Sequence, residues 1–154
     1  VTALDGRLDT EALAAQATAA DLVLDCTDNF ATRHAINRAC VAHRRPLVSG
    51  AAIRFDGQLA VFDARQPDGP CYACVFPEGE GEDELCAVMG VFAPVTGIIG
   101  TLQAAEALKL VAGDDHAIGT SMHGRLLLLD ALTMTFRTVQ VPRDPRCAVC
   151  GARH

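Results

Sequence analysis

The stretch Leu22-Val23-Leu24-Asp25-Cys26-Thr27-Asp28-Asn29 decides the fold of this chain. The apolar triplet at its start predicts a short buried strand, and apolar residues recur at helical spacing after Asn29. Asp28 and Asn29 are therefore expected where a strand ends and a helix begins. In an open α/β sheet, ligands bind in the crevice at the carboxyl ends of the strands, and helix N-termini offer unpaired N–H groups to anions.

Two interpretations of Asp28 and Asn29 stay open on this pattern. A carboxylate at this edge is well placed to hold the magnesium ion of a bound nucleoside triphosphate. Alternatively, one of the two side chains is only the N-cap of the helix, a common use of both residue types. The two roles are compatible with each other.

Composition restricts the class of protein. A length of 154 residues fits one domain with a sizeable core. The net charge is −6 and no basic stripe is present, so no nucleic-acid partner is expected. Seven cysteines without a signal-peptide pattern indicate reduced thiols in the cytoplasm, used for metal binding or catalysis. The first residue is Val1, which is compatible with a start inside a larger protein.

Hydrophobic periodicity predicts an α/β fold with a Rossmann-like mixed sheet and C-terminal antiparallel hairpins. The helix that follows Asn29 is expected to reach residue 45, because Pro46 disfavours helix in the residue before it. Asp56-Gly57 between apolar alternations is a strong hairpin signal. The other expected elements are a helix after an Asp9 cap, strands over 22–24, 47–50 and 126–129, and a return strand over 134–141 with a bulge near Thr138.

Residues 87–105 contain no ionisable side chain and approach the length of a membrane span. We reject a membrane span, since glycine, proline, threonine and glutamine dilute the run, and predict a buried helix of a soluble protein. Pro94 opens this helix and Gly113 ends it. Its apolar face, either core or a subunit contact, is expected to comprise Val95, Ile98, Ile99, Leu102, Ala105 and Leu108.

Residues 64–86 form a polar connection, rich in glycine and proline, whose length makes it a candidate for a functional segment. Five acidic residues lie within positions 78–84. Residues 75–85 have little to bury, so ordering them costs backbone entropy without compensation. We expect them to be poorly ordered in the absence of a partner protein.

Two cysteine pairs share a two-residue spacing, Cys71-x-x-Cys74 and Cys147-x-x-Cys150. That spacing lets both sulfurs of a pair face one tetrahedral ion at about 2.3 Å, and two pairs complete a closed structural zinc site. A redox pair and unrelated buried thiols are the alternatives, although neither pair stands in a thioredoxin-like context.

The three remaining cysteines fall into two groups. Cys26 and Cys40 lie in apolar strand and helix patterns and are interpreted as core residues. Cys86 lies at the end of the polar connection, where a thiol is either an exposed residue or a nucleophile.

Several stretches, taken together, resemble the ThiF/MoeB/HesA family, bacterial relatives of the ubiquitin-activating enzymes. The resemblance covers nearly the whole chain from about residue 20 and rests on residues 24–29 with Arg33 and Asn37, 46–52, 71–74, 93–97, 100–104, 106–107 with Lys109, and 147–151. It implies a homodimeric adenylyltransferase that uses ATP and Mg²⁺. The implied substrate is the C-terminal glycine of a ubiquitin-like sulfur-carrier protein in thiamine or molybdopterin biosynthesis.

The resemblance also implies roles for individual residues. Asp28, with Asn29 beside it, matches the position that holds the nucleotide and its magnesium ion. Arg33 matches an arginine assigned to the carrier's tail or the phosphates, and Cys86 matches a crossover-loop cysteine that in some members handles the activated carrier or its sulfur. The residues that match the family's zinc ligands are Cys71, Cys74, Cys147 and Cys150.

The chain departs from the family at its start. Members begin with a strand, a glycine-rich nucleotide loop and basic residues that clamp the phosphates, and none of these precedes Val1. Residues 1–154 are therefore interpreted as a single domain, the C-terminal two thirds of an adenylation domain whose N-terminal nucleotide-binding unit is missing. Such a piece is expected to be inactive alone, because adenylation depends on clamping the triphosphate. The alternative is a non-catalytic, zinc-stapled module for dimerisation or carrier binding.

Overall fold

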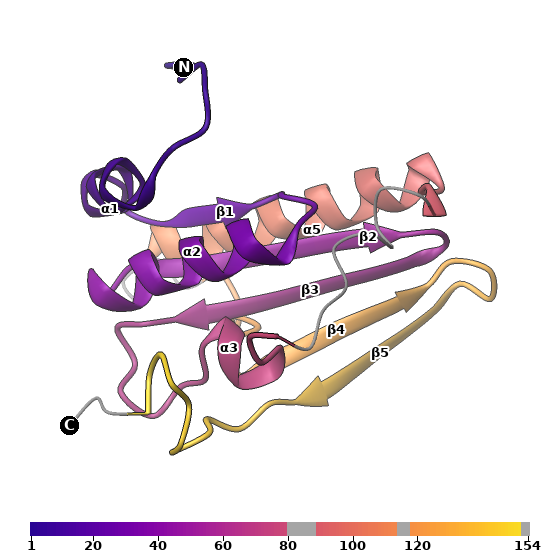
Figure 1. The fold of residues 1–154 in the computed structure, drawn as a ribbon. Coiled ribbons are helices and arrows are strands. Elements are labelled where there is room, and N and C mark those ends of the chain that lie inside the picture. The colour runs from indigo at the N-terminus through magenta and orange to yellow at the C-terminus, as the bar shows by residue number, and fades with distance from the viewer. Residues whose placement is uncertain (80–88, 114–117, 152–154) are drawn as a thin grey trace.

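The computed structural model describes residues 1–79, 89–113 and 118–151. They contain a five-stranded sheet in the order β1-β2-β3-β4-β5 (Figure 1). β1 (Val23–Asp25) pairs in parallel with β2 (Pro46–Ile53). The other three pairs are antiparallel and add β3 (Asp56–Asp63), β4 (Arg125–Asp130) and β5 (Thr135–Gln140). The predicted mixed α/β sheet with C-terminal antiparallel hairpins is confirmed.

The helices of the described ranges are α1 (Thr10–Ala19), α2 (Phe30–Ala42), α3 (Tyr72–Val75) and α5 (Ala93–Ala112). Asp9 caps α1 as predicted, because its carboxylate accepts a hydrogen bond from the Ala12 N–H at 2.8 Å. The prediction that α2 reaches residue 45 is wrong. α2 ends at Ala42, because Arg44 takes a left-handed φ of 53° and Pro46 already belongs to β2.

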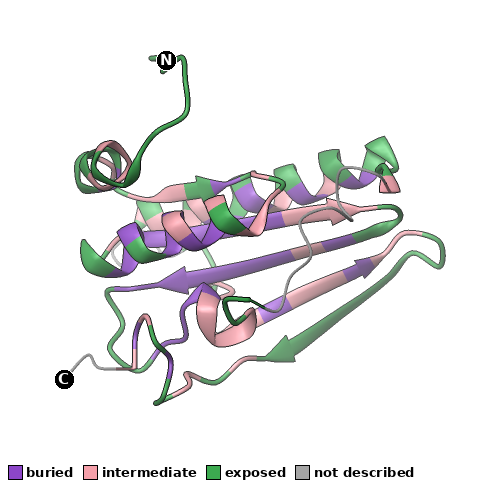
Figure 2. Ribbon diagram, in the orientation of Figure 1, coloured by how far each residue is buried: buried purple, intermediate pink, exposed green. Residues whose placement is uncertain are grey.

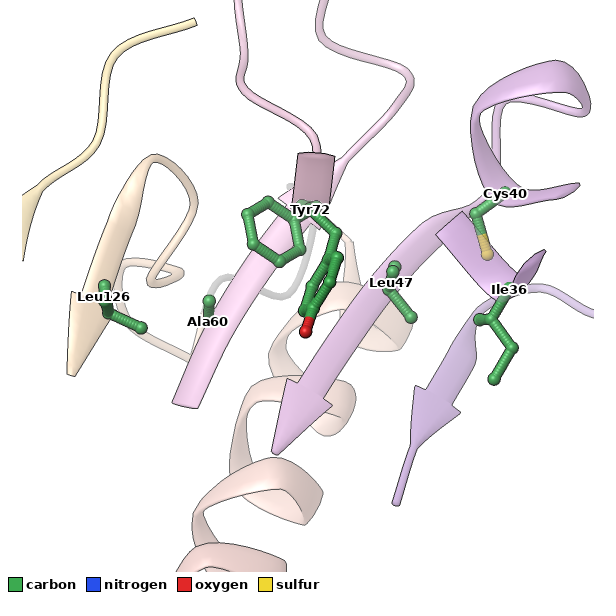
Figure 3. Packing of buried hydrophobic residues seen from close by; sticks show 7 residues of the cluster. Ile36, Cys40, Leu47, Ala60, Tyr72 and Leu126 are labelled. Carbon is green, nitrogen blue, oxygen red and sulfur yellow. The ribbon is translucent and has the colours of Figure 1, made fainter. Parts of the chain in front are cut away.

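Two hydrophobic layers lie on opposite faces of the sheet, since side chains alternate along a strand. α2 lies in front of the sheet in Figure 1 and α5 behind it. On the α2 face, Tyr72 packs among Leu47, Ala60 and Leu126 (Figure 3). On the α5 face, the buried residues are Val48, Leu59, Val61, Val95, Ile99 and Leu129. β2 and β3 are accordingly the most buried strands, whereas β5 is exposed along its length (Figure 2).

The β2–β3 hairpin is present, but its predicted turn is wrong. Ile53 pairs with Asp56, so Arg54 and Phe55 make the turn, and Arg54 has a left-handed φ of 51°. Asp56-Gly57 instead begins β3. Gly57 is needed there for close packing, because a Cβ atom would lie 2.8 Å from Ile99 of α5.

The bulge predicted near Thr138 is absent. β4 and β5 pair without interruption from Arg125 opposite Gln140 to Asp130 opposite Thr135. The slip in the hydrophobic pattern has another cause: both faces of β5 are exposed, so neither face has to be apolar.

The prediction of a buried helix from Pro94 to Gly113 is correct in position and only partly correct in burial. α5 packs one face on β2 and β3, but Ala105 and Leu108 are exposed. The buried residues of α5 are Val95, Ile99, Gln103 and Glu106. Two of them are polar, so a search for apolar residues at helical spacing does not find them. By length and composition alone α5 would suffice to span a membrane, and 22% of its most apolar window is buried.

Two earlier predictions fall outside the described residues. Cys86 lies there, and so does most of the segment 75–85 for which poor order is predicted. Both stay predictions.

Candidate functional site

A cleft of about 1200 Å³ lies at the carboxyl ends of β1 and β2. Residues 26–28 after β1, residues 50–53 of β2 and the N-terminal half of α5 line it, and β4 and β5 form its outer wall. A second hollow, of about 730 Å³, lies at the N-terminus of α2 and includes Arg7. Cys26, Thr27 and Asp28 line both. The predicted site therefore lies at a concave edge of the sheet.

The structure separates the two interpretations of Asp28 and Asn29. Asn29 is the N-cap of α2, since its Oδ1 accepts a hydrogen bond from the Thr32 N–H at 2.8 Å. Asp28 is exposed, and among the residues that the structure describes its Oδ1 accepts just one hydrogen bond, a long one of 3.4 Å from the Asn29 side chain. The cap belongs to Asn29, so the Asp28 carboxylate remains accessible to a ligand from either hollow.

Arg33 is buried, with 7% of its surface exposed, one turn into α2. Its guanidinium donates hydrogen bonds to the main-chain carbonyls of Thr27 and of Gly50, the latter at 3.3 Å. It also lies 3.8 Å from the Asp25 carboxylate. These contacts hold α2 against β1, the loop that follows it, and β2, while Arg33 still lines the larger cleft.

Asp25 is a buried carboxylate that sequence reasoning missed. Only 1% of its surface is exposed. Its Oδ1 accepts hydrogen bonds from the Thr27 N–H at 2.9 Å and the Thr27 hydroxyl at 2.7 Å, and its Oδ2 accepts one from the Ser49 hydroxyl at 3.0 Å. A buried charge needs such partners. The available signal was an aspartate placed directly after the apolar triplet of residues 22–24.

Gln103 is a second missed residue. Its amide nitrogen donates hydrogen bonds to the main-chain carbonyls of Asp25 at 2.9 Å and Val48 at 3.2 Å. Its side-chain oxygen faces the thiol of Cys26, with 3.6 Å between the two atoms. The prediction that Cys26 belongs to the core is wrong, because β1 ends at Asp25 and Cys26 is exposed.

Cys40 is buried as predicted. Burial, with the nearby Asp25 carboxylate as a second cause, raises the pKa of the Cys40 thiol to about 12. Because the thiolate is the nucleophile, this burial disfavours a nucleophilic role for Cys40.

The four paired cysteines meet in one cluster. Their sulfur atoms all lie within 4.8 Å of one another. The shortest separations are 3.4 Å for Cys74 and Cys150, 3.7 Å for Cys71 and Cys147, and 3.9 Å for Cys71 and Cys74. Tetrahedral zinc with bonds of 2.3 Å requires sulfur atoms about 3.8 Å apart. The four-thiol donor set and its size therefore fit a tetrahedral metal ion.

The electrostatics of the cluster favour the thiolate, the form that binds metals, at Cys74, whereas burial raises the pKa of the Cys147 thiol. A hydrogen bond from the Cys71 thiol is the main cause that lowers the pKa of Cys74 to about 4. The same hydrogen bond is the main cause that raises the pKa of Cys71, and burial of the thiol is the second cause. One thiol of this pair is thus ionised readily at the expense of the other.

Neighbouring residues fix the C-terminal half of the cluster. Arg143 donates hydrogen bonds to the carbonyls of Cys150 at 2.7 Å and Pro67 at 3.1 Å. Gly151 allows the chain to fold tightly, because a Cβ atom there would lie 2.5 Å from the Pro145 carbonyl oxygen. These contacts shape residues 145–151, here called the C-terminal knuckle, which lies beside α3 in Figure 1 and brings Cys147 and Cys150 to Cys71 and Cys74.

Comparison with known proteins gives a consistent set of relatives. The ThiF family profile matches residues 1–149. The chain is 46% identical over 152 residues to the molybdopterin-synthase adenylyltransferase of Escherichia coli (strain K12), covering 98% of this chain and 59% of that protein. It is 43% identical over 151 residues to the sulfur carrier protein ThiS adenylyltransferase of the same strain, covering 98% and 58%. The chain thus spans somewhat more than half the length of these two relatives.

Other relatives match smaller parts of longer proteins or share only the fold. The adenylyltransferase and sulfurtransferase MOCS3 of Sus scrofa is 48% identical over 136 residues, 86% of this chain and 29% of that protein. Among solved structures, E. coli MccB superposes with a TM-score of 0.70 at 17% identity, over 96% of this chain and 44% of MccB. E. coli MccB with ATP superposes with a TM-score of 0.65 at 18% identity, over 85% and 40%.

Proposed function

The chain belongs to the ThiF family, and on that premise we propose that the intact protein adenylates the C-terminal glycine of a ubiquitin-like sulfur-carrier protein with ATP. Two of its relatives are named adenylyltransferases of molybdopterin synthase and of the sulfur carrier ThiS. One structural observation carries the proposal: the Asp28 carboxylate is exposed at the concave edge formed by the carboxyl ends of β1 and β2. Asn29, and not Asp28, caps α2.

The proposed reaction joins the carrier to AMP. A carboxylate oxygen of the carrier's terminal glycine forms a bond to the α-phosphorus of ATP, the bond to the β-phosphate oxygen breaks, and pyrophosphate leaves. Bound Mg²⁺ supplies positive charge that offsets the charge of the triphosphate. Asp28 would hold that ion, and Asn29 orients the loop by capping α2.

In this proposal Arg33 acts indirectly, because it holds the main chain around the cleft in place. Its hydrogen bonds fix the carbonyls of Thr27, in the loop after β1, and of Gly50, within β2. The same guanidinium lines the cleft, which is compatible with its predicted contact to the carrier's tail or the phosphates. Cys86 as a residue that handles the activated carrier stays a prediction.

Exchange of pyrophosphate into ATP in the presence of the carrier tests the role of Asp28. In the intact protein, Asp28→Ala and Asp28→Asn should lower the exchange rate on the order of a hundredfold or more, as expected when a positioned charge is removed. Asp21→Ala is the matched control, because Asp21 is also exposed and lies outside both hollows. Undiminished exchange in a folded Asp28→Ala protein would remove Asp28 from the site.

We expect residues 1–154 alone to show no exchange, because the relatives whose activity is named are considerably longer. Exchange by these residues alone would show that the nucleotide site is misplaced. An intact wild-type protein that binds a carrier without exchange would favour the alternative of a non-catalytic, zinc-stapled module.

We also propose that the four-cysteine cluster binds one structural Zn²⁺. Four ligands leave no open coordination position, so the ion would fasten the C-terminal knuckle to α3 and take no part in the reaction. Metal analysis of protein purified without chelator should give about one zinc per chain, and Cys147→Ser should lose the metal and lower the melting temperature. Cys26→Ser is the control, since Cys26 lies outside the cluster. Less than about half an equivalent of zinc in the wild type would contradict the site.

The outer face of α5 supports the proposed homodimer. Gly97, Gly100 and Ala104 are exposed small residues, and Leu108 and Val111 are 62% and 64% exposed. Sedimentation analysis should show a dimer that Leu108→Glu weakens; an unchanged dimer would place the contact elsewhere. We further propose a cytoplasmic protein with neither nucleic-acid nor membrane partners, in keeping with its acidic charge and the polar residues on the packed face of α5.

A further inference from the structure

We propose that Asn37 is a positioning residue that couples the four-cysteine centre to α2, and through α2 to the cleft at the carboxyl ends of β1 and β2. This inference rests on the metal site proposed above. The proposed zinc site by itself would only fasten the C-terminal knuckle. The inference adds that metal binding also affects the candidate site at the cleft.

Asn37 makes two hydrogen bonds to the metal-binding segment. Its side-chain oxygen accepts one from the Tyr72 N–H at 3.0 Å, and its amide nitrogen donates one to the Cys71 sulfur at 3.6 Å. The Tyr72 N–H requires an acceptor, so the oxygen faces it and the NH₂ group must face the sulfur. Asn37 and Cys71 are each only 1% exposed, so both bonds are shielded from bulk solvent.

The hydrogen bond from Asn37 to the Cys71 sulfur would stabilise the negative charge of a metal-bound cluster. Four thiolates around Zn²⁺ carry a formal charge of −2, from four negative charges and two positive ones, at a largely buried place. A buried negative charge needs donors around it. Groups that hydrogen-bond to metal ligands also fix the ligands' orientation, and their removal commonly weakens metal binding 10–100-fold.

The position of Asn37 on α2 links the metal centre to the cleft. Arg33, Asn37 and Val41 follow one another at intervals of four residues and therefore share one face of the helix. Arg33 holds the carbonyls of Thr27 and Gly50 at the cleft. One turn on, Asn37 holds Cys71, and one further turn on, Val41 packs against the cysteine cluster. Metal binding should therefore tighten the docking of α2 at both places.

Two Asn37 variants test whether the hydrogen bond to the Cys71 sulfur carries the effect on zinc binding. Asn37→Leu removes both, whereas Asn37→Asp keeps an acceptor for Tyr72 and replaces the donor to sulfur with a carboxylate oxygen. Zinc affinity, measured by competition with a chromogenic chelator, should fall about tenfold or more in both variants. Ile36→Ala is the matched control, because Ile36 is the adjacent buried residue of α2 and packs with Leu47 and Phe62.

Hydrogen exchange supplies a second readout, which starts from the wild-type chain. Removing zinc from the wild-type chain should accelerate amide exchange in α2 between Arg33 and Val41, and this metal-dependent protection should be smaller in Asn37→Asp. Each of three results would overturn the inference. These are wild-type zinc affinity in the Asn37 variants, an equal loss of zinc affinity in Ile36→Ala, and amide exchange in α2 that does not change when zinc is removed. A wild-type chain that binds no zinc would instead overturn the metal site itself.

Discussion

The side-chain amide of Gln103 in α5 donates a hydrogen bond to the main-chain carbonyl of Asp25, the last residue of β1, at 2.9 Å. The same nitrogen donates to the Val48 carbonyl of β2 at 3.2 Å. One helix side chain therefore joins the two parallel strands at the edge where the candidate cleft begins, and Gln103 itself lines that cleft.

Gln103→Leu should destabilise the fold. The substitution keeps the volume roughly but leaves the carbonyls of Asp25 and Val48 buried without this donor, which costs about 1–3 kcal/mol of unfolding free energy. Urea denaturation measures the change. Gln16→Leu is the control, since Gln16 is exposed on α1 and its replacement should shift stability by no more than about 0.5 kcal/mol. Equal effects of the two substitutions would refute the bridging role.

Gly50→Ala should also be destabilising, because the new Cβ atom would lie 2.4 Å from the Gln103 amide. Overpacking of this kind costs about 1–3 kcal/mol. Gly97→Ala is the contrasting variant: within one chain an added Cβ meets nothing within 4 Å there, so α5 should gain up to about 1 kcal/mol when both proteins carry Leu108→Glu, which weakens the proposed dimer contact. In the double variant Gly50→Ala/Gln103→Ala the cost should be less than additive, as a double-mutant cycle by urea denaturation would show. Strict additivity would mean that the two side chains do not compete for space.

Arg33 and Asp28 should differ sharply in their effects on folding. Arg33→Ala would leave the buried Asp25 carboxylate without its cationic partner, a change that costs on the order of 3–5 kcal/mol. Asp28→Ala removes an exposed side chain and should change the unfolding free energy by less than about 0.5 kcal/mol. Thermal and urea unfolding of both variants provide the measurement. If Arg33→Ala proved as stable as the wild type, its guanidinium would not be needed to hold α2.

Asp63 should make stability depend on pH in the acidic range. Burial would raise the pKa of this carboxyl, but hydrogen bonds from Arg65, at 2.9 Å and 2.8 Å to its two oxygens, outweigh that effect and lower the pKa. A lowered folded pKa contributes stability above the unfolded value of about 3.9, and that contribution is lost as the pH falls through the folded pKa.

The variant Asp63→Asn tests this dependence. Its deficit in unfolding free energy relative to the wild type should be largest near neutral pH and should shrink as the pH falls below about 4. Urea titrations from pH 7 to about pH 2.5 measure it, with the exposed Asp68→Asn as control. A deficit that stays constant with pH would show that the charge of Asp63 contributes nothing.

Local features of this protein were determined by the sequence itself. The caps at Asp9 and Asn29, the strand that ends before Asp28 and the spacing within each cysteine pair depend on neighbours only a few residues away. Such features can be predicted from the sequence, because residues at short spacing come together in almost any fold that contains the same helix or turn. The mixed α/β sheet follows from the same local periodicities.

Tertiary structure alone decided which polar residues are buried and which cysteine is exposed. Gln103 lies in an apolar helix pattern, yet it is buried because its partners Asp25 and Val48 come from strands more than fifty positions earlier. Cys26 reads as a strand residue, yet it is exposed because pairing with β2 stops at Asp25. Burial of a polar group depends on whether distant partners satisfy it, and no local pattern records those partners.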